Sequence, residues 1–224
     1  SSRSSRGTST ARWFTARIGD CKRSKQWELA LHHLAEMRAR ALEANVITYS
    51  ALIDACARAS RPRAALQLLE DMHLHSLAPN VITYGAAISA CEKGRMPSKA
   101  FQLHGAMRQA CVEPNVVTYS ALISVCEKAA QPDKALKLFG EMIERGLEPN
   151  AISCNALASA LAKGPQPWRA LGVLELARQL GLRPTVVTYN ALIGACERLR
   201  APERALALLE EMRREALQPD AVTL

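Results

Sequence analysis

Six basic residues recur at intervals of 35 along the chain and form the most regular set of charged side chains in the sequence. They are Arg23, Arg58, Lys93, Lys128, Lys163 and Arg198. Single cations at even spacing suit a polyanion whose phosphates also repeat at even spacing. Each of them also falls near the predicted end of a helix, where the helix dipole favours a positive charge. The residues alone therefore leave two roles open, phosphate binding and helix stabilisation.

The other residue types that carry chemistry form no catalytic or metal-binding pattern. The five histidines do not share the 35-residue interval; they are His32, His33, His73, His75 and His104. The sequence contains no Gly-rich phosphate loop, no Ser-His-Asp set and no Cys-x-x-Cys pair. We therefore expect a protein that is not an enzyme and that uses no cofactor, no metal and no small-molecule substrate.

Five of the seven cysteines also follow the 35-residue interval. They are Cys21, Cys56, Cys91, Cys126 and Cys196, and the corresponding residue in the remaining interval is Leu161. A position that accepts leucine is a small, buried apolar position, and a free cysteine behaves as a small apolar residue. The pattern predicts buried, unpaired thiols and a reducing compartment.

The elements that position these residues are copies of one 35-residue unit. Residues 116–150, VVTYSALISVCEKAAQPDKALKLFGEMIERGLEPN, have counterparts at 46–80, 81–115, 151–185 and 186–220, and a degenerate copy lies at 11–45. Such periodicity is typical of a solenoid. Residues 1–10 are polar and predicted to be disordered, and residues 221–224 begin a further repeat.

Each repeat contains the pattern of two helices. In residues 116–129 the apolar side chains recur at helical spacing, and Gln131-Pro132 separates them from a second apolar helix that stops near Gly146. Breaks are likewise expected near Pro62, Pro97, Pro167 and Pro202. The predicted fold class is all-α, an α-solenoid superhelix of stacked helix-turn-helix repeats.

The amino-acid composition says less about the class of binding partner than the repeat does. The net charge is +8, but residues 1–27 hold seven of the 29 basic residues and only one acid, Asp20. This Ser/Arg-rich start resembles a mitochondrial or plastid transit peptide, and a basic linker is the alternative. No run of about eighteen apolar residues is present, so no membrane span is expected.

The signatures V-x-T-Y and L-x-P-N, together with the period, resemble the P-type pentatricopeptide repeat. The resemblance covers nearly the whole chain and implies a right-handed superhelix that binds single-stranded RNA, one base per repeat. It further implies work on organellar RNA processing, stability, editing or translation in a plastid or mitochondrion, with protein partners that act on the bound RNA. A protein-interaction scaffold that uses the same concave face is the alternative function.

The resemblance assigns roles to three sets of repeat positions. Position 2 packs against the base and is occupied by Ile47, Ile82, Val117, Ile152 and Val187, whereas the first copy has Arg12. Positions 5 and 35 select the base, as the pairs Thr15/Asn45, Ser50/Asn80, Gly85/Asn115, Ser120/Asn150, Asn155/Thr185 and Asn190/Asp220. The six cations described above occupy position 13, which the resemblance assigns to the RNA backbone.

The same family rules imply a base for each pair. Thr or Ser with Asn implies adenine, and Asn with Asp implies uracil. Gly85/Asn115 implies a weak adenine preference, and Asn155/Thr185 implies a pyrimidine. Independently of any ligand, Asn, Asp and Thr just before a helix are also good N-caps, so position 35 has a purely structural alternative.

Overall fold

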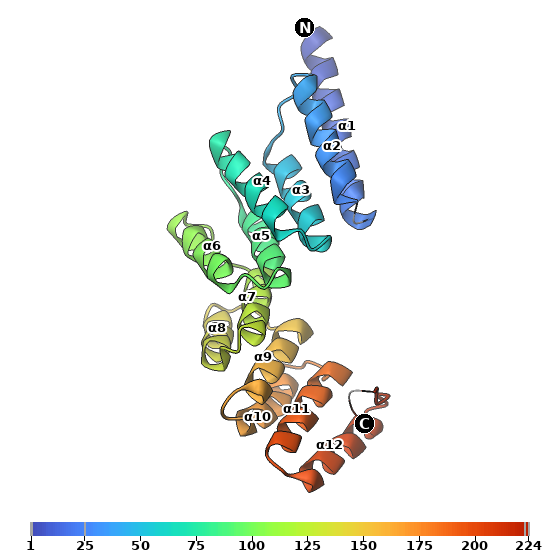
Figure 1. The fold of residues 1–224 in the computed structure, drawn as a ribbon, viewed down its shortest axis with the longest axis vertical. Helices are drawn as coiled ribbons and strands as arrows, with labels where there is room; N and C mark the ends of the chain where they lie inside the picture. Colours follow the sequence, from blue (N-terminus) through green and yellow to red (C-terminus); the bar gives the residue numbers. More distant parts are fainter. Residues whose placement is uncertain (1, 25, 222, 224) are drawn as a thin grey trace. The chain divides into compact units, whose positions relative to one another are not determined.

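The structure is a computed structural model that describes residues 2–24, 26–221 and 223; the side chains of residues 2–9, Lys22 and Arg23 lie outside this description. All regular structure in these residues is helical (Figure 1). The helices are α1 (Ser2–Ser24), α2 (Trp27–Ala39), α3 (Val46–Arg58), α4 (Pro62–Leu74), α5 (Val81–Lys93), α6 (Pro97–Gln109), α7 (Val116–Lys128), α8 (Pro132–Glu144), α9 (Ala151–Lys163), α10 (Trp168–Gln179), α11 (Val186–Arg198) and α12 (Pro202–Arg214).

Proline sets the start of most second helices, as the sequence predicts. Pro62, Pro97, Pro132 and Pro202 are the first residues of α4, α6, α8 and α12. Proline is tolerated there because the first backbone N–H groups of a helix have no partner within the helix. In the fifth repeat the helix begins one residue later, at Trp168, and Pro167 is its N-cap.

The later start of α10 follows from the turn that precedes it. In four other repeats the residue at position 15 has a positive φ: Ser60, Arg95, Ala130 and Arg200, with φ between 51° and 56°. The fifth repeat has Pro165 at this position. The proline ring fixes φ near −65°, so the left-handed turn cannot form there. The C-cap of α9, Gly164, is instead extended, with ψ of −178°.

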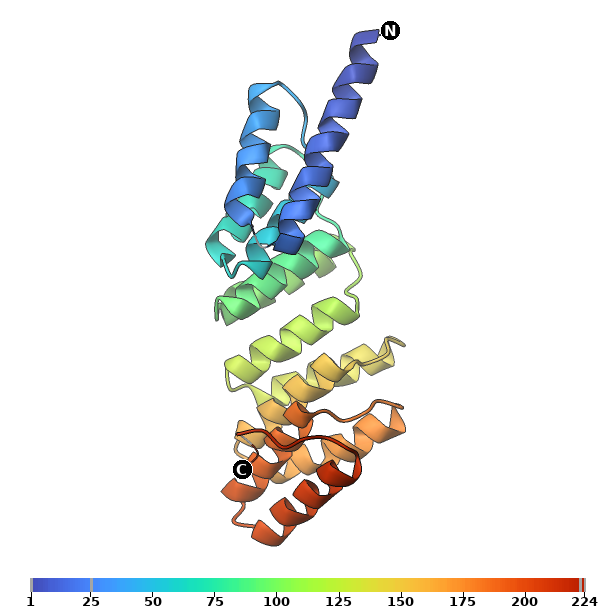
Figure 2. The same cartoon turned by 90° about the vertical axis from the view of Figure 1, so that its right-hand side faces the viewer.

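The chain divides into two compact units, residues 1–114 and residues 115–224. In the first unit, α1 packs on α3 and α3 packs on α5, while α2, α4 and α6 each pack on the first helix of their own hairpin. In the second unit, α7, α9 and α11 pack in the same order, with α8, α10 and α12 as their partners. Figure 2 shows the hairpins of each unit in a second orientation. Within each unit the fold is therefore a stack of helical hairpins, and the predicted all-α solenoid class is confirmed.

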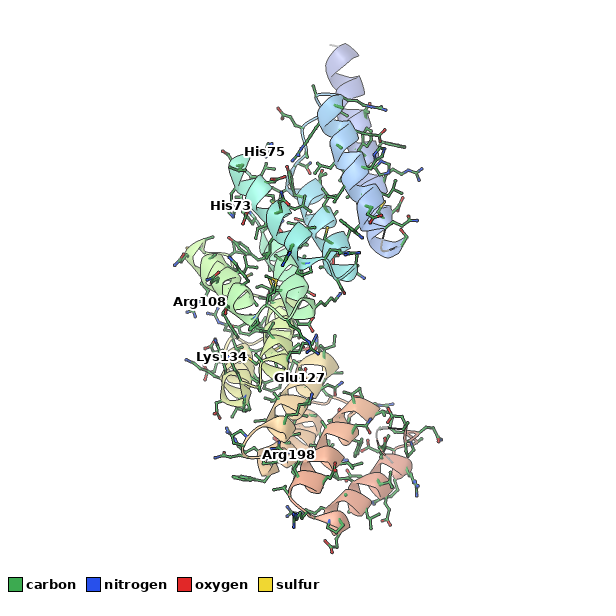
Figure 3. The ribbon with its side chains drawn as sticks, in the orientation of Figure 1. His73, His75, Arg108, Glu127, Lys134 and Arg198 are labelled. Carbon is green, nitrogen blue, oxygen red and sulfur yellow. The ribbon has the colours of Figure 1, made fainter. Side chains whose placement is uncertain are left out.

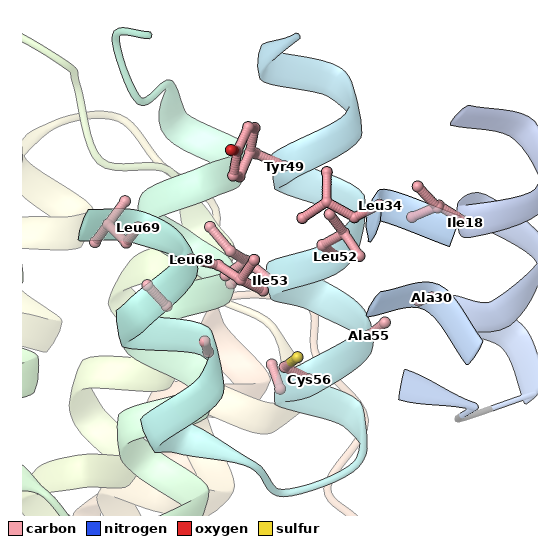
Figure 4. Packing of buried hydrophobic residues seen from close by; sticks show 14 of the residues in the cluster. Ile18, Ala30, Leu34, Tyr49, Leu52, Ile53, Ala55, Cys56, Leu68 and Leu69 are labelled. Carbon is pink, nitrogen blue, oxygen red and sulfur yellow. The ribbon is translucent and has the colours of Figure 1, made fainter. Parts of the chain in front are cut away.

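The core of each unit is built from aliphatic side chains that recur in every repeat. In the first unit Leu52, Ile53 and Cys56 of α3 lie between α1, α2 and α4 (Figure 4). Position 20 holds a small residue that is completely buried in five repeats: Ala30, Ala65, Ala100, Ala135 and Ala170. A small side chain at this position lets two helix backbones approach closely.

The five recurring cysteines are buried, with exposed fractions of 4% or less, and Leu161 is 3% exposed at the corresponding position. None of the seven cysteines forms a disulfide. Burial raises the pKa of Cys56, Cys91 and Cys126 to about 11. The prediction of buried, unpaired thiols at this repeat position is confirmed.

Polar groups connect successive repeats at the fourth position of the first helix. The guanidinium of Arg38 donates to the hydroxyl oxygen of Tyr49 over 2.9 Å and to Asp71 Oδ2 over 3.1 Å. Between the last two repeats, Arg178 of α10 and Tyr189 of α11 both donate to Glu211 of α12. Burial, followed by the nearby carboxylates, raises the pKa of Tyr189. These contacts tie the second helix of one repeat to both helices of the next.

The first ten residues differ from the prediction of disorder. Helix α1 begins at Ser2 and continues through the whole segment, while Ser1 lies outside the described residues. At the other end, Ala221 and Thr223 form a turn. No helix within the described part of the chain combines the length and the apolar character that crossing a membrane requires.

Candidate nucleic-acid interface

The second residue of five first helices is a branched aliphatic side chain that faces solvent. The exposed fractions are 67% for Ile47, 60% for Ile82, 60% for Val117, 62% for Ile152 and 55% for Val187. Isoleucines at position 8 of the same helices are fully buried: Ile53, Ile88 and Ile123. Leaving an aliphatic side chain in water forgoes about 25 cal/mol for each Å² that burial would remove. Each of these five repeats thus presents one apolar side chain that is more than half exposed to solvent.

Position 35 places a polar residue directly before each first helix, and five of these residues are N-caps: Asn45, Asn80, Asn115, Asn150 and Thr185. Their side-chain oxygens accept from the backbone N–H of the third helical residue, as Asn45 Oδ1 does from Thr48 at 3.0 Å. Asp220 Oδ1 accepts from the N–H of Thr223 in the same way, at 3.1 Å. The structural alternative of capping is confirmed. In the asparagines, the cap uses the carbonyl oxygen and leaves the amide nitrogen for other partners.

In the second unit the structure brings the residues at positions 5 and 35 together. Ser120 Oγ lies 3.3 Å from Asn150 Oδ1, Thr185 Oγ1 donates to Asn155 Oδ1 at 3.1 Å, and Asn190 Nδ2 donates to Asp220 Oδ1 at 2.9 Å. The two members of each pair are 30 residues apart in the chain. Each pair forms a small polar site a few residues from an exposed position-2 side chain.

In the first unit a threonine stands between the two positions. The hydroxyl oxygens of Thr15 and Thr48 lie 2.9 Å apart, and those of Ser50 and Thr83 lie 2.7 Å apart. Thr48 and Thr83 in turn donate to the cap oxygens of Asn45 and Asn80, at 3.1 and 3.0 Å. Gly85, at position 5 of the third repeat, contributes no side chain. Sequence spacing did not reveal these threonines, because their contacts join neighbouring repeats.

The position-13 cations lie at the opposite end of the first helices. With a rise of about 1.5 Å per residue, positions 2 and 13 are about 16 Å apart along the helix. Lys93 Nζ donates to the backbone oxygen of Ala57 at 2.9 Å, and Arg198 Nη1 donates to that of Ala162 at 2.5 Å. Lys163 Nζ lies 2.5 Å from Glu127 Oε1. In all three cases the acceptor belongs to position 12 of the preceding repeat.

These contacts support the helix-stabilising role for the cations. Carbonyl groups in the last turn of a helix lack partners within the helix, and a cation from the next repeat satisfies one of them. Figure 3 labels Arg198 on α11 and Glu127 on α7. Arg58 forms an ion pair with Asp54 of its own helix at 3.3 Å, and Lys128 is exposed. The side chain of Arg23 lies outside the described residues.

The histidines do not gather into a site. His73 and His75 lie at the end of α4 and are exposed (Figure 3), while the rings of His32 and His33 are 6.2 Å apart. Across the residues that the structure describes, no group of three or more His, Cys, Asp or Glu side chains is arranged to hold a metal ion. Cys111 is the exposed cysteine in this part of the chain, in the turn after α6.

Sequence models of pentatricopeptide repeats match most of the chain. A model described as PPR repeat family matches residues 79–128, 114–163 and 184–224, and one described as pentatricopeptide repeat domain matches residues 33–95. No curated protein matches the chain in sequence.

Several solved structures are similar in fold, among them the following three. The pentatricopeptide repeat protein PPR10 from maize is 28% identical, with a TM-score of 0.62 over 94% of this chain and 30% of its own. PPR10 in complex with an 18-nt psaJ RNA element is 19% identical in its alignment, with a TM-score of 0.68 over 94% of this chain and 36% of its own. The PPR domain of protein-only RNase P 1 from Arabidopsis thaliana, in complex with tRNA, is 17% identical, with a TM-score of 0.67 over 76% of this chain and 90% of its own.

The chain therefore spans about a third of the PPR10 chains that it resembles. The repeat models cover more than half of its length, and they coincide with the helical hairpins described above. The chain belongs to the pentatricopeptide repeat family.

Proposed function

We propose that this chain binds single-stranded RNA and selects its sequence with one base per repeat. The observation that carries the proposal is the set of five exposed aliphatic side chains at position 2, beside polar pairs at positions 5 and 35. An apolar side chain packs against the face of a base, while nearby donors and acceptors bind its Watson–Crick edge. Burying half-exposed Ile or Val side chains contributes about 1 kcal/mol each, for about 50 Å² of contact.

The pairs give a proposed recognition sequence. Thr15/Asn45, Ser50/Asn80 and Ser120/Asn150 select adenine, and Gly85/Asn115 selects adenine weakly, since Gly85 has no side chain. Asn155/Thr185 selects a pyrimidine and Asn190/Asp220 selects uracil. With the RNA running 5′ to 3′ as the chain runs from its N- to its C-terminus, the site is A-A-(A)-A-(C/U)-U. The position-13 cations contribute backbone contacts in addition to their structural role.

The biological setting that we propose is organellar RNA processing, stability, editing or translation. The Ser/Arg-rich start of the sequence resembles an organellar transit peptide. PPR10 bound to a psaJ RNA element and the PPR domain of an RNase P bound to tRNA support RNA as the ligand. The chain would act by occupying RNA or by presenting it to a protein partner, and catalysis is not part of its proposed role.

The test is RNA binding by variants of position 2. Replacing Ile152 and Val187 together with Asn should lower the affinity for AAAACU RNA about 25-fold to 100-fold, at about 1 kcal/mol each, and should leave the melting temperature unchanged because both side chains are exposed. The matched control is Leu206→Asn on the second helix α12, which is 61% exposed. Equal losses in the control and the double variant would contradict the proposal. Binding of a peptide instead of RNA would favour the scaffold function.

A further inference from the structure

Repeat position 3 carries a buried hydroxyl group in α3, α5, α7, α9 and α11, and again at Thr223 in the turn near the end of the chain. Thr83 is 0% exposed, Thr188 is 2% exposed and Thr223 is 7% exposed. Each hydroxyl oxygen accepts from the backbone N–H of the preceding position-35 residue: Asn80 at 3.3 Å, Thr185 at 3.0 Å and Asp220 at 3.0 Å. A hydroxyl has a single hydrogen to donate. The direction of that hydrogen therefore decides which neighbours must donate and which must accept.

For the pair of the second repeat, Ser50/Asn80, the hydrogen of Thr83 in the next repeat goes to the cap oxygen, Asn80 Oδ1, at 3.0 Å. Ser50 must then be the donor in its 2.7 Å contact with Thr83. Ser50, which is only 6% exposed, therefore has only lone pairs left for a ligand, and Asn80 has the two N–H groups of its amide nitrogen. An acceptor beside a donor complements the Watson–Crick edge of adenine, which has a donor at N6 and an acceptor at N1.

For the pair of the fifth repeat, Asn155/Thr185, the hydroxyl hydrogen of Thr188 points toward the position-5 residue and not toward the cap. Thr188 Oγ1 donates to Asn155 Oδ1 at 2.5 Å, and Thr185 Oγ1 donates to the same oxygen at 3.1 Å. Both lone pairs of this carbonyl oxygen are thereby engaged, so Asn155 offers its amino group to a ligand. Both pyrimidines carry an acceptor that such a donor can bind, at O2.

The sixth repeat repeats this arrangement with a carboxylate. Thr223 Oγ1 lies 2.5 Å from Asn190 Oδ1 and 3.0 Å from the cap oxygen Asp220 Oδ1, and we assign its single hydrogen to the shorter contact. Asn190 Nδ2 donates one hydrogen to Asp220 Oδ1 at 2.9 Å. The second amino hydrogen of Asn190 and the carboxylate of Asp220 then form a donor beside an acceptor group. This pattern complements O4 and N3–H of uracil.

We propose that Thr83, Thr188 and Thr223 are positioning residues for base selection. Each hydroxyl fixes the hydrogen-bonding polarity of the position-5 side chain of the preceding repeat, and through it the base that the pair accepts. The proposal rests on the proposed function, because this polarity has an effect only where a base is bound.

The pair of the fourth repeat, Ser120/Asn150, differs because the hydroxyl that follows it makes no bond to position 5. Ser153 has the same position and is part of a capping box, but its hydroxyl donates to the backbone oxygen of Asn150 at 2.8 Å. Ser120, at position 5 of that repeat, donates to the backbone oxygen of Val116 at 2.7 Å. A variant of Ser153 therefore removes the cap contact without removing a bond to position 5.

The experiment is binding-site selection from a randomised RNA pool with the full chain. Thr188→Val keeps the shape of the side chain and removes the hydroxyl. We expect the pyrimidine preference at the fifth base to fall about fivefold, corresponding to one hydrogen bond, with the other bases unchanged. Thr188→Ser should restore the preference. Ser153→Ala is the matched control and should leave the fourth base unchanged. Thr83→Val tests the same effect at the second base should Thr188→Val fail to fold.

A preference at the fifth base that survives in Thr188→Val would overturn the proposal. So would an equal loss at the fourth base in Ser153→Ala, because the hydroxyl would then act only through the helix cap. A second measurement needs no RNA. The ¹⁵N relaxation of the Asn155 side-chain amide should show greater mobility in Thr188→Val than in the wild type. Absence of base selection by the wild type contradicts the proposed function, whereas an amide that stays equally rigid contradicts the positioning role alone.

Discussion

The amino and carboxyl ends of the first helices differ in which side chains they bury and which they expose. At the amino ends, Ile82 and Ile152 are more than half exposed, and the polar groups beside them are held by caps. At the carboxyl ends, the thiols of Cys91 and Cys126 are fully buried, and the cation that follows at Lys93 bonds to the preceding repeat. The amino ends therefore expose apolar side chains to solvent. At the carboxyl ends, even a charged side chain such as Lys93 bonds to the neighbouring repeat.

This difference separates the residues that repeat because the fold needs them from those whose recurrence the fold does not explain. Three of the cations at position 13 bond to a residue of the preceding repeat, and Arg58 pairs with Asp54 of its own helix. The aliphatic residues at position 2 are more than half exposed to solvent. Regular recurrence alone does not distinguish the two kinds of position, whereas burial and bonding do.

The largest expected effect is a loss of stability at alkaline pH, caused by the buried cysteines near the carboxyl ends of the first helices. Burial raises the pKa of Cys56, Cys91 and Cys126 from 9.0 to about 11. Above pH 9 the unfolded chain loses these protons first, so the stabilisation is complete below pH 9 and is lost as the pH rises to 11. We expect each thiol to lower the free energy of unfolding by about 1–3 kcal/mol over this interval.

Urea unfolding at pH 8, 10 and 11 measures this loss. The control is the variant in which all three cysteines are replaced by Ala, which removes the titrating groups while keeping small apolar side chains. The alkaline loss should be several kcal/mol smaller in this variant. An identical pH dependence in both proteins would show that the thiols are accessible to water.

At the amino ends, Asn150→Asp should change the base that is bound without removing the cap. A carboxylate oxygen accepts from the N–H of Ser153 as the amide oxygen does, at 3.0 Å in the structure, but the amide donor becomes an acceptor. We expect the preference at the fourth base to move from adenine to guanine, by about tenfold to 100-fold. Binding-site selection measures it, with Asn150→Ala as the variant that also loses the cap. A shift at a different base would refute the assignment of repeats to bases.

The salt dependence of RNA binding tests how far the carboxyl ends also contact the ligand. Six phosphate contacts at about −0.7 each give a log–log slope of about −4. Replacing Lys93 and Lys128 with Ala should make the slope less steep by about 1.4. Fluorescence anisotropy between 50 and 300 mM salt measures the slope. An unchanged slope with a lower melting temperature would leave these cations with only their structural role.

The smallest expected effect is that of a single exposed ion pair. The side chain of Lys163 is 62% exposed where it contacts Glu127. Solvent screens such a pair, so Lys163→Met should change the free energy of unfolding by less than about 0.5 kcal/mol. Lys93→Met, which removes a bond to a backbone carbonyl, should cost more, about 1 kcal/mol. Chemical denaturation of both variants compares them, and the reverse order would contradict the structural difference between the two lysines.

Local sequence was sufficient for the helices and for the caps. Asn115 before the V-V-T-Y of α7 predicts an N-cap because the interaction spans three residues. The recurrence of Cys56 and Cys126 beside Leu161 predicts burial because the choice among these residues depends only on size. Position 15 is a local effect too: Pro165 rules out the left-handed turn by its own geometry.

Contacts between neighbouring repeats could not be derived in this way. Thr83 contacts Ser50 across 33 residues, and Lys93 contacts Ala57 across 36. Each depends on how one hairpin packs on the next, and the repeat period gives no information about that packing. The structure of α1 from Ser2 onward was missed for a related reason, since composition alone predicted disorder there.

The caps described at position 35 also limit how this protein can diverge. A substitution of Asn80 or Asn150 is acceptable to the fold only if the new side chain can accept the hydrogen bond at the start of the helix, which restricts the choice mainly to Asn, Asp, Ser and Thr. If the same residues select bases, then the residue types available for base selection at position 35 are limited to those that can also cap a helix. Drift in RNA preference can then proceed by single substitutions that leave the melting temperature almost unchanged.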